Sequence, residues 1–312
     1  MAVAARVSPK DFFTTEEWAG LSAHSRWRGL LLVAHCWAVI VAAGAMAVIW
    51  PVTIPIAVAL IGARQLGLAI LMHDAAHRAL SSDPKVNDFV GHWICGQPVG
   101  AGLTSYRNYH LTHHKFAQQA EDPDLGLSAP FPITRKSLNR KMIRDLTGQT
   151  FFKQRTAVLR SKLKNRKPDQ SALVIGFGEG GRLGGFLLWQ LALLTLLSAV
   201  GLWWAYFVLW LLPMATWYPL VTRLRNIAEH ACIAKDEPDP LKHARTTTAN
   251  LIERAFIAPY YVQYHCEHHM FMHLPCYQLP AAHRLLKRSG ALAAMRYEPG
   301  GYPAVLKVAS GA

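Results

Sequence analysis

The sequence predicts an all-α integral membrane protein with four transmembrane helices in two hairpins and a cytoplasmic helical cap. Hydrophobic residues make up 52% of the 312 residues and charged residues only 17%, against about 25% charged in an ordinary soluble domain. The apolar residues lie in four long blocks, and a strongly basic stretch lies between the second and the third. Buried core helices of a soluble protein are the alternative, but four such blocks are hard to bury in a chain of this length.

The first hairpin is predicted over residues 29–72. Its apolar blocks at 29–50 and 55–72 approach the roughly 20 residues that cross the hydrocarbon core of a bilayer. Pro51 and Pro55 allow only a tight turn between the two blocks. Residues 1–28 mix acids and bases without an apolar core. They therefore indicate a cytoplasmic N-terminal helix that starts near Thr14, and no signal peptide.

Residues 73–184 are predicted to form a cytoplasmic segment. Its apolar stretch at 89–103 is short and rich in glycine, which suits an interfacial or re-entrant segment rather than a span. The stretch 135–167 holds twelve Lys and Arg residues and one acid, Asp145. Such stretches stay in the cytoplasm and lie against anionic lipid head groups. No nucleic-acid-binding signature accompanies the charges, so we expect no nucleic-acid partner.

The second hairpin is predicted over residues 185–222, as two blocks at 185–204 and 205–222. A formal G-x-G-x-x-G at 176–181 precedes it, but an apolar block follows where a dinucleotide site needs an ordinary αβ unit, so we expect a flexible entry loop. Residues 223–312 form a second cytoplasmic segment. Four spans place both termini and both long segments on the basic, cytoplasmic side. We expect one multi-pass domain over 1–312, in a bacterial inner membrane.

The five cysteines agree with a cytoplasmic setting. They form no C-x-x-C pair, and Cys36 lies inside a predicted span. An odd number of scattered cysteines is no disulfide framework and fits a reducing compartment.

Three histidine boxes carry the chemical signal of the sequence. An H-x-x-x-H at 73–77 is followed by an H-x-x-H-H at 110–114 and another at 265–269. On an α-helix these spacings place the imidazoles of one box on the same face. Imidazole is a nitrogen ligand suited to iron, zinc and copper. Eight clustered histidines exceed the need of one metal ion and suggest two.

A fourth group stands at the end of the last predicted span. Asn226 and His230 form an N-x-x-x-H, four residues apart on one helix face. The first box stands at the cytoplasmic end of the second span, and the other two boxes lie in cytoplasmic segments. All four groups can therefore meet at one level, at or just above the membrane face.

This set of motifs, in this order and interleaved with two hairpins, resembles the membrane fatty acid desaturase family. The likeness covers about residues 30–290 and is most detailed at 265–280 and in the Glu-Asp-Pro-Asp run at 121–124. The resemblance implies a di-iron centre with Asn226 bound directly or through water. The histidine ligands that it implies are His73, His77, His110, His113, His114, His230, His265, His268 and His269.

Ligating imidazoles usually donate their second N–H to a carboxylate or a carbonyl. Of the acids near the boxes, Asp122, Asp124 and Glu267 are candidates for this supporting role.

Several other polar residues lie outside the boxes. His24, His92 and His243 are expected to be solvated or interfacial, His35 to be a polar group of the core or of a substrate tunnel, and His273 and His283 to support the third box. Arg64, inside the second span, is costly in lipid and is expected to face the protein interior or the interface.

The resemblance implies an O2-dependent desaturase that uses two iron ions to introduce a C=C bond into the aliphatic chain of a fatty acid or acyl lipid. A hydroxylase or ketolase acting on a lipid, sphingoid base, carotenoid or other amphiphile would use the same ligands. A metal transporter is a third, non-enzymatic alternative, but it predicts ligands that lead across the membrane.

Reduction of O2 needs electrons from outside the chain. The sequence has no cysteine cluster for an iron–sulfur centre and no His-Pro-Gly-Gly run of a fused cytochrome b5. A separate donor is therefore implied, either a ferredoxin with its reductase or a cytochrome. The basic stretch 135–167 could steer an acidic donor, or it could contact lipid head groups alone.

Overall fold

The computed structural model describes residues 4–164 and 182–311. The glycine motif at 176–181 lies outside the described residues. The chain is mostly helical, as predicted. The strands of the described part are two residues long: β1 (Thr246–Thr247) pairs in parallel with β2 (Tyr297–Glu298).

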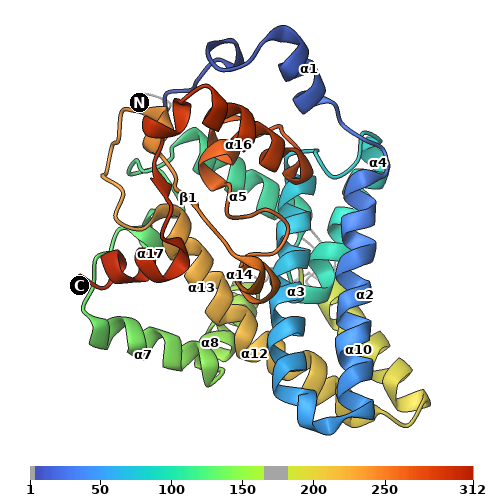
Figure 1. The fold of residues 1–312 in the computed structure, drawn as a ribbon. Coiled ribbons are helices and arrows are strands. Elements are labelled where there is room, and N and C mark those ends of the chain that lie inside the picture. The colour runs from blue at the N-terminus through green and yellow to red at the C-terminus, as the bar shows by residue number, and fades with distance from the viewer. Residues whose placement is uncertain (1–3, 165–181, 312) are drawn as a thin grey trace.

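The helices α2 (Arg28–Ile49) and α3 (Ile54–Ala76) lie side by side and are joined by the 3₁₀ turn η2 (Pro51–Thr53) (Figure 1). Buried residues of α2 recur every three or four positions, which makes one stripe that packs against its neighbours. The thiol of Cys36 on this stripe donates to the carbonyl of Arg64 on α3, at 3.3 Å.

Helix α3 is the central helix of the molecule. From Ile61 to Ala76 almost every side chain is buried, because α2, α5 (Leu103–Lys115) and α13 (Trp217–His230) pack around it. Its polar residues therefore lie inside the protein rather than against lipid. Arg64 is among them, with 6% of its surface exposed, as the sequence led us to expect.

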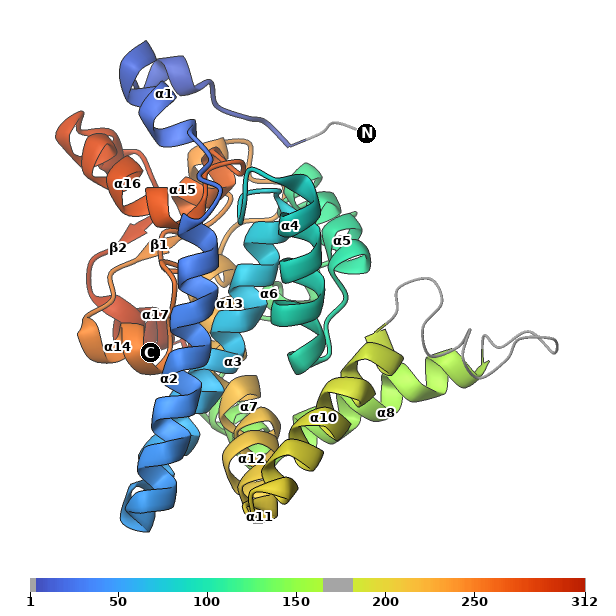
Figure 2. The ribbon, with the colours of Figure 1, turned by 90° about the vertical axis from the view of Figure 1, so that its right-hand side faces the viewer.

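The second apolar pair is less regular than predicted. Helix α10 (Arg182–Ala199) leads into α11 (Trp203–Ala205), the π-helical η5 (Tyr206–Leu211), α12 (Leu212–Ala215) and α13. The predicted helix at 205–222 is thus interrupted and then continues to His230. Pro213 and Pro219 lack the N–H that an unbroken α-helix needs, which accounts for the irregularity. Figure 2 shows α10 diverging from α2 and α3.

Three helical stretches of the described chain are long and apolar enough to cross a membrane: Arg28–Ile49, Pro51–Ala76 and Trp203–His230. The helix at Leu183–Ala199 is apolar but shorter. Three of the four predicted spans are therefore found by length and composition, and the one at 185–204 stays a prediction.

The apolar stretch 89–103 is helical and packs on α3. It follows α4 (Pro84–Phe89) and comprises the π-helical η3 (Val90–Gly96) and the 3₁₀ turn η4 (Gln97–Val99). Gly91 lies so close to α3 that a Cβ there would be 2.3 Å from the Cβ of Ala75. A glycine is needed at this position because nothing larger fits between the two helices.

We use the name cap for four helices that lie at the Ala76 end of α3: α1 (Thr15–Ser22), α5, α15 (His265–Met270) and α16 (Leu279–Arg288) (Figures 1 and 2). Thr14 caps α1 by accepting the N–H of Glu17, as predicted from the sequence. The remaining described helices are α6 (Leu125–Ser128), α7 (Arg135–Leu146), α8 (Gln149–Lys164), α14 (Leu251–Phe256) and α17 (Gly301–Ala309), with 3₁₀ turns η1 (Pro9–Asp11), η6 (Pro240–Lys242), η7 (Cys276–Gln278) and η8 (Ala291–Ala293).

Candidate metal centre

The ends of α3, α5 and α13 meet the short helix α15 and bring the histidine motifs together. His73 lies in the last turn of α3 and His77 directly follows that helix. The second box lies in the last turns of α5, and the third box occupies most of α15. His230 is the last residue of α13. These ends belong to segments far apart in the sequence, so the site forms only when the whole chain is folded.

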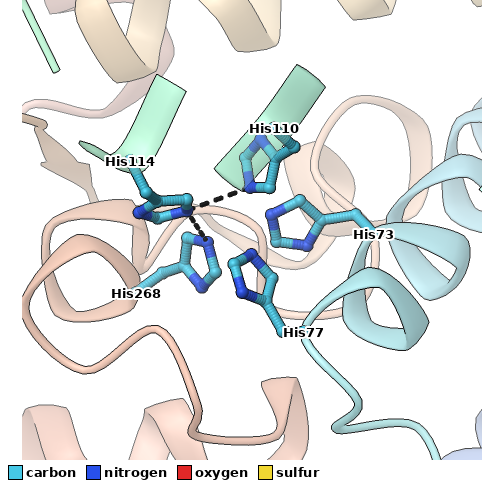
Figure 3. A group of neighbouring side chains, drawn as sticks. All are labelled: His73, His77, His110, His114 and His268. Atoms are coloured by element: carbon cyan, nitrogen blue, oxygen red, sulfur yellow. Dashed lines mark hydrogen bonds between the residues drawn. The ribbon is translucent and has the colours of Figure 1, made fainter. Parts of the chain in front are cut away.

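Five of the imidazoles form one group, here called the five-histidine cluster: His73, His77, His110, His114 and His268. Their ligand atoms all lie within 4.8 Å of one another, and all five residues are buried. Figure 3 shows the rings pointing toward a common centre. The Nε2 atom of His114 is 3.0 Å from Nε2 of His110 and 3.0 Å from Nε2 of His268.

The other four form the four-histidine cluster: His113, His230, His265 and His269. Nε2 of His230 is 2.9 Å from Nε2 of His265, and Nε2 of His113 is 3.3 Å from Nε2 of His269. Helices α5 and α15 each contribute to both clusters, so the clusters are neighbours. All nine histidines named from the sequence belong to one cluster or the other.

The nitrogen pairs are spaced as metal ligands would be. Two nitrogens that each lie about 2.1 Å from one ion are roughly 3.0–3.4 Å apart at angles of about 90–110°. Without an ion, Nε2 of His73 and both ring nitrogens of His77 are buried and have no hydrogen-bond partner. Such orphaned atoms are rare in proteins because their burial costs free energy. The donor set therefore fits two transition-metal ions, one for each cluster.

The electrostatic environment keeps these imidazoles neutral. Burial, followed by the proximity of the other histidines, holds the pKa of His110, His114, His265 and His269 well below the usual 6.5. Burial likewise lowers the pKa of His77 to about 3. Since a metal ion binds the unprotonated nitrogen, the ligands are in the required state at neutral pH.

Asp122 orients one member of the four-histidine cluster. Nδ1 of His113 donates to Oδ1 of Asp122 at 2.7 Å, and the carboxylate also accepts the backbone N–H groups of Gln118 and Asp124. This arrangement fixes the tautomer of His113 and directs Nε2 into the cluster. Asp124 lies farther away, with 3.8 Å between Oδ2 and Nδ1 of His113, and accepts the hydroxyl of Tyr109.

Glu267 makes its side-chain hydrogen bonds to residues outside both clusters. Its carboxylate lies 2.5 Å from Nδ1 of His283 and accepts the hydroxyl of Thr246. It therefore ties α15 to α16 and β1. Asn226 is half-buried on α13, one turn before His230, and makes no side-chain hydrogen bond to a residue of the described part.

Two neighbours of the site were not identified from the sequence. His243, expected at the surface, is buried, and its carbonyl lies 3.3 Å from Nδ1 of His230. Nε2 of Gln118 also lies 3.3 Å from Nδ1 of His230. Neither contact has a sequence signal, because one uses a backbone oxygen and the other a residue between motifs. Glu229 precedes His230 on α13, and its Oε2 lies 3.5 Å from Nε2 of His265.

Comparison with known proteins agrees with this geometry. The family model described as "Fatty acid desaturase" matches residues 48–300, which contain every histidine of both clusters. The chain belongs to the fatty acid desaturase family. The resemblance noted from the histidine motifs is thereby confirmed.

Two curated members of the family are similar to this chain. The dihydrorhizobitoxine desaturase of Bradyrhizobium elkanii is 28% identical over 239 residues, which cover 74% of this chain and 67% of that protein. The sn-1 acyl-lipid omega-3 desaturase (ferredoxin) of Synechocystis sp. (strain ATCC 27184 / PCC 6803 / Kazusa) is 26% identical over 249 residues, covering 70% of this chain and 63% of that protein. The alignments thus span about two thirds of the length of each relative.

Proposed function

We propose that this family member is an O2-dependent desaturase that introduces a C=C bond into the aliphatic chain of a fatty acid, acyl lipid or related amphiphile. The observation that carries the proposal is the convergence of nine histidines, eight of them buried and His269 half-buried, into two adjacent clusters. The two similar proteins are both named as desaturases, although their names give different substrates.

Two iron ions would be held by the five-histidine and four-histidine clusters, with Asn226 as a weaker oxygen ligand, directly or through water. Bound iron supplies the oxidising power, drawn from O2, that removal of hydrogen from an unactivated C–H bond requires. The chain supplies the geometry. Asp122 and the carbonyl of His243 hold two ligating rings in place, and every clustered histidine except the half-buried His269 is shielded from bulk water.

The balanced reaction needs two electrons. The substrate loses two hydrogen atoms, and O2 accepts these with two further electrons and two protons to form two water molecules. We propose a separate donor, either a ferredoxin with its reductase or a cytochrome. A ferredoxin appears in the printed name of one relative. The exposed basic residues of α7 and α8 would attract an acidic donor.

We further propose that the chain is a multi-pass protein of a bacterial inner membrane, with the metal centre on the cytoplasmic side. The three apolar spans support membrane insertion. The basic stretch at 135–167 supports the orientation, because such stretches remain in the cytoplasm.

One experiment separates desaturation from the hydroxylase or ketolase alternative. The chain would be expressed with a ferredoxin and its reductase under ¹⁸O2, and the lipids would be analysed by mass spectrometry. A desaturase yields products two mass units lighter that contain no ¹⁸O, whereas a hydroxylase or ketolase leaves ¹⁸O in the product.

Metal analysis of the same purified protein tests the cofactor. We expect about two irons per chain, and full activity from protein that holds only zinc would contradict the proposal. The transporter alternative predicts ligands along the spans, whereas the clusters lie together at one end of α3 and α13.

A further inference from the structure

A cleft of about 590 Å³ opens between the α2–α3 hairpin and α14, separate from both histidine clusters. Leu32, Val39 and Leu60 give it an apolar lining. Polar and charged groups stand among them: His35 on α2, Arg64 on α3, and Arg254, Tyr260 and Tyr261 from the later segment. Helix α14, which bears Arg254, contacts α3 and lies beside it in Figure 1. The cleft therefore combines an apolar surface with a cationic one.

Arg64 is the unusual residue of this cleft. It lies within a membrane-span helix and is 6% exposed. One of its terminal nitrogens donates to the carbonyls of Ala255, at 2.7 Å, and Arg254, at 3.2 Å. Its guanidinium carbon lies over the ring of Tyr260, 5.4 Å from the centroid, but its buried Nε has no hydrogen-bond partner among the described residues. An incompletely satisfied charge in a span is costly and is by default a candidate for a functional role.

No acid neutralises this cationic surface. Across residues 4–164 and 182–311, neither Arg64 nor Arg254 forms an ion pair with a carboxylate. The nearby carboxylate of Glu253 instead accepts the backbone N–H of Asn250 at the start of α14. Two guanidinium groups therefore face one cleft without a counter-charge, and an anionic ligand would supply it.

The cleft adjoins the metal centre through two tyrosines. Tyr260 and Tyr261 line both the cleft and a cavity of about 20 Å³, whose other walls include His73, His265 and His268. Both tyrosines have left-handed backbones, with φ of 52° and 64°. This conformation costs a non-glycine residue roughly 1–2 kcal/mol and is concentrated at functional sites. The two residues form the wall between the cleft and the metal ligands.

We propose that the cleft binds the anionic head group of the substrate, a carboxylate or a phosphate, on Arg64 and Arg254. The alkyl chain then extends from Arg64 past Leu32 and the tyrosine wall to the metal centre. This inference rests on the proposed function and names its substrate class. Arg64 and His73 are nine residues apart on α3, which is about 13 Å along the helix axis. An extended chain of roughly ten carbons, with bonds of about 1.5 Å in a zigzag, covers that distance.

Binding of three C16 probes tests the proposal without turnover. Radiolabelled palmitate, hexadecyl phosphate and hexadecanol would be titrated against the purified protein in neutral detergent. We expect both anions to bind about tenfold or more tightly than hexadecanol, since charge-assisted hydrogen bonds are the strong ones. Arg254→Gln and Arg64→Gln should each weaken both anions about tenfold and leave hexadecanol unchanged. Arg288→Gln, at an exposed site on α16 that pairs with Glu17, is the matched control.

Arg254 is exposed, so its variant keeps the test decisive even if the buried Arg64 is needed for folding. Three results would overturn the proposal. The first is that the wild type binds palmitate and hexadecanol equally, the second is that it binds neither anion, and the third is that Arg254→Gln binds the anions as the wild type does. If phosphatidylglycerol displaces palmitate and phosphatidylcholine does not, the anion belongs to a phospholipid. If neither lipid displaces palmitate, the anion belongs to a single-chain acid. Both results support an oxyanion site. Iron content and product formation, measured on the same samples, report separately on the desaturase proposal.

Discussion

His230 is the least conspicuous of the nine histidines because it stands outside the three boxes. It closes the four-histidine cluster, with its Nε2 2.9 Å from Nε2 of His265. We expect His230→Ala to lose activity as fully as a change within a box and to lower the iron content. Asn226→Ala should retain more iron but lose much of its turnover, since an amide oxygen is a weaker ligand for iron than imidazole.

Iron content and product formation of both variants in the same membranes check this expectation. His24→Ala is the control, because His24 is exposed and its Nε2 lies at the carbonyl of His273, outside both clusters. Near-normal iron and activity in His230→Ala would mean that only the three boxes hold metal.

Asp122 allows a finer test, because it touches a ligand and not the metal. Asp122→Asn keeps the shape of the side chain but removes the charge that fixes the tautomer of His113. Loss of such a partner typically costs about 10–100-fold in metal affinity or activity. Chelator competition for iron, with Glu121→Gln as the exposed neighbouring control, measures the effect. An affinity equal to that of the wild type would show that the contact is unimportant.

The motif spacing named all nine clustered histidines, but it could not assign them to two clusters. His110, His113 and His114 share one helix yet divide between the clusters, and this depends on how α5 is turned against α3 and α15. His243 was placed wrongly because a histidine outside the motifs gives no sequence signal of its burial. Its Nε2 lies 2.8 Å from the carbonyl of Glu237, and its own carbonyl lies 3.3 Å from Nδ1 of His230.

Among the elements, α5 depends most strictly on its register. Successive residues of a helix are turned by about 100°, so His110 and His114 lie one turn apart while His113 points toward the other cluster. One alanine inserted after Leu111 would turn His113 and His114 by about 100° relative to His110. We expect iron to be lost from both clusters.

Iron counting, with circular dichroism to verify that the helices remain, checks the insertion variant. An alanine inserted after Gly290, in the exposed turn that follows α16, should leave the iron content unchanged. Two irons in the α5 insertion variant would show that α5 is not a rigid ligand scaffold.

The elements were predictable where one physical signal dominates. Helices α2 and α3 follow from long apolar blocks, and α1 follows from a capping box. The π-helical η5 and the break before α13 had no such signal. Prolines predict that a helix is interrupted there, but not which local structure the interruption takes. The strands β1 and β2 are two residues each, too short to produce an alternating pattern.

For the whole molecule, the buried histidines predict a loss of stability in acid. In the unfolded chain their pKa is near 6.5, whereas in the folded chain burial lowers it, to about 3 for His77. Below pH 6.5 the unfolded state therefore binds protons that the folded state does not. The free energy of unfolding consequently decreases as the pH is lowered. Above pH 6.5 these histidines are neutral in both states and do not change the free energy of unfolding.

The thermal midpoint of the metal-free protein in detergent should therefore drop between pH 6.5 and 5.5, before most carboxylates titrate. Replacing His110 and His114 with Gln should make that decline shallower, because both have pKa values that are lowered by burial. A midpoint that stays level or rises over this range would contradict the neutral state of the cluster.

The course of the whole chain also bears on the fourth span. Helix α3 ends at the metal centre, and the stretch Trp203–His230 starts at the opposite end of the molecule and returns there (Figures 1 and 2). The chain must therefore travel outward between them, and α10 covers the last part of this path, running obliquely from the level of α8 to α11 (Figure 2). At 18 residues it is about 27 Å long, close to the roughly 30 Å of a hydrocarbon core.

We therefore predict that α10 crosses the membrane although it is shorter than the other spans. Reporter fusions after residue 150 and at the C-terminus should both be cytoplasmic, and a fusion after Gly201, in the turn between α10 and α11, should be on the other side. The three fusions serve as controls for one another, because each reporter is active in one compartment only. A periplasmic reporter after residue 150 would place α5 and α15 on opposite faces, where their histidines could not share two clusters. A cytoplasmic reporter after Gly201 would mean that neither α10 nor Trp203–His230 crosses the bilayer, and that only the α2–α3 hairpin anchors the enzyme.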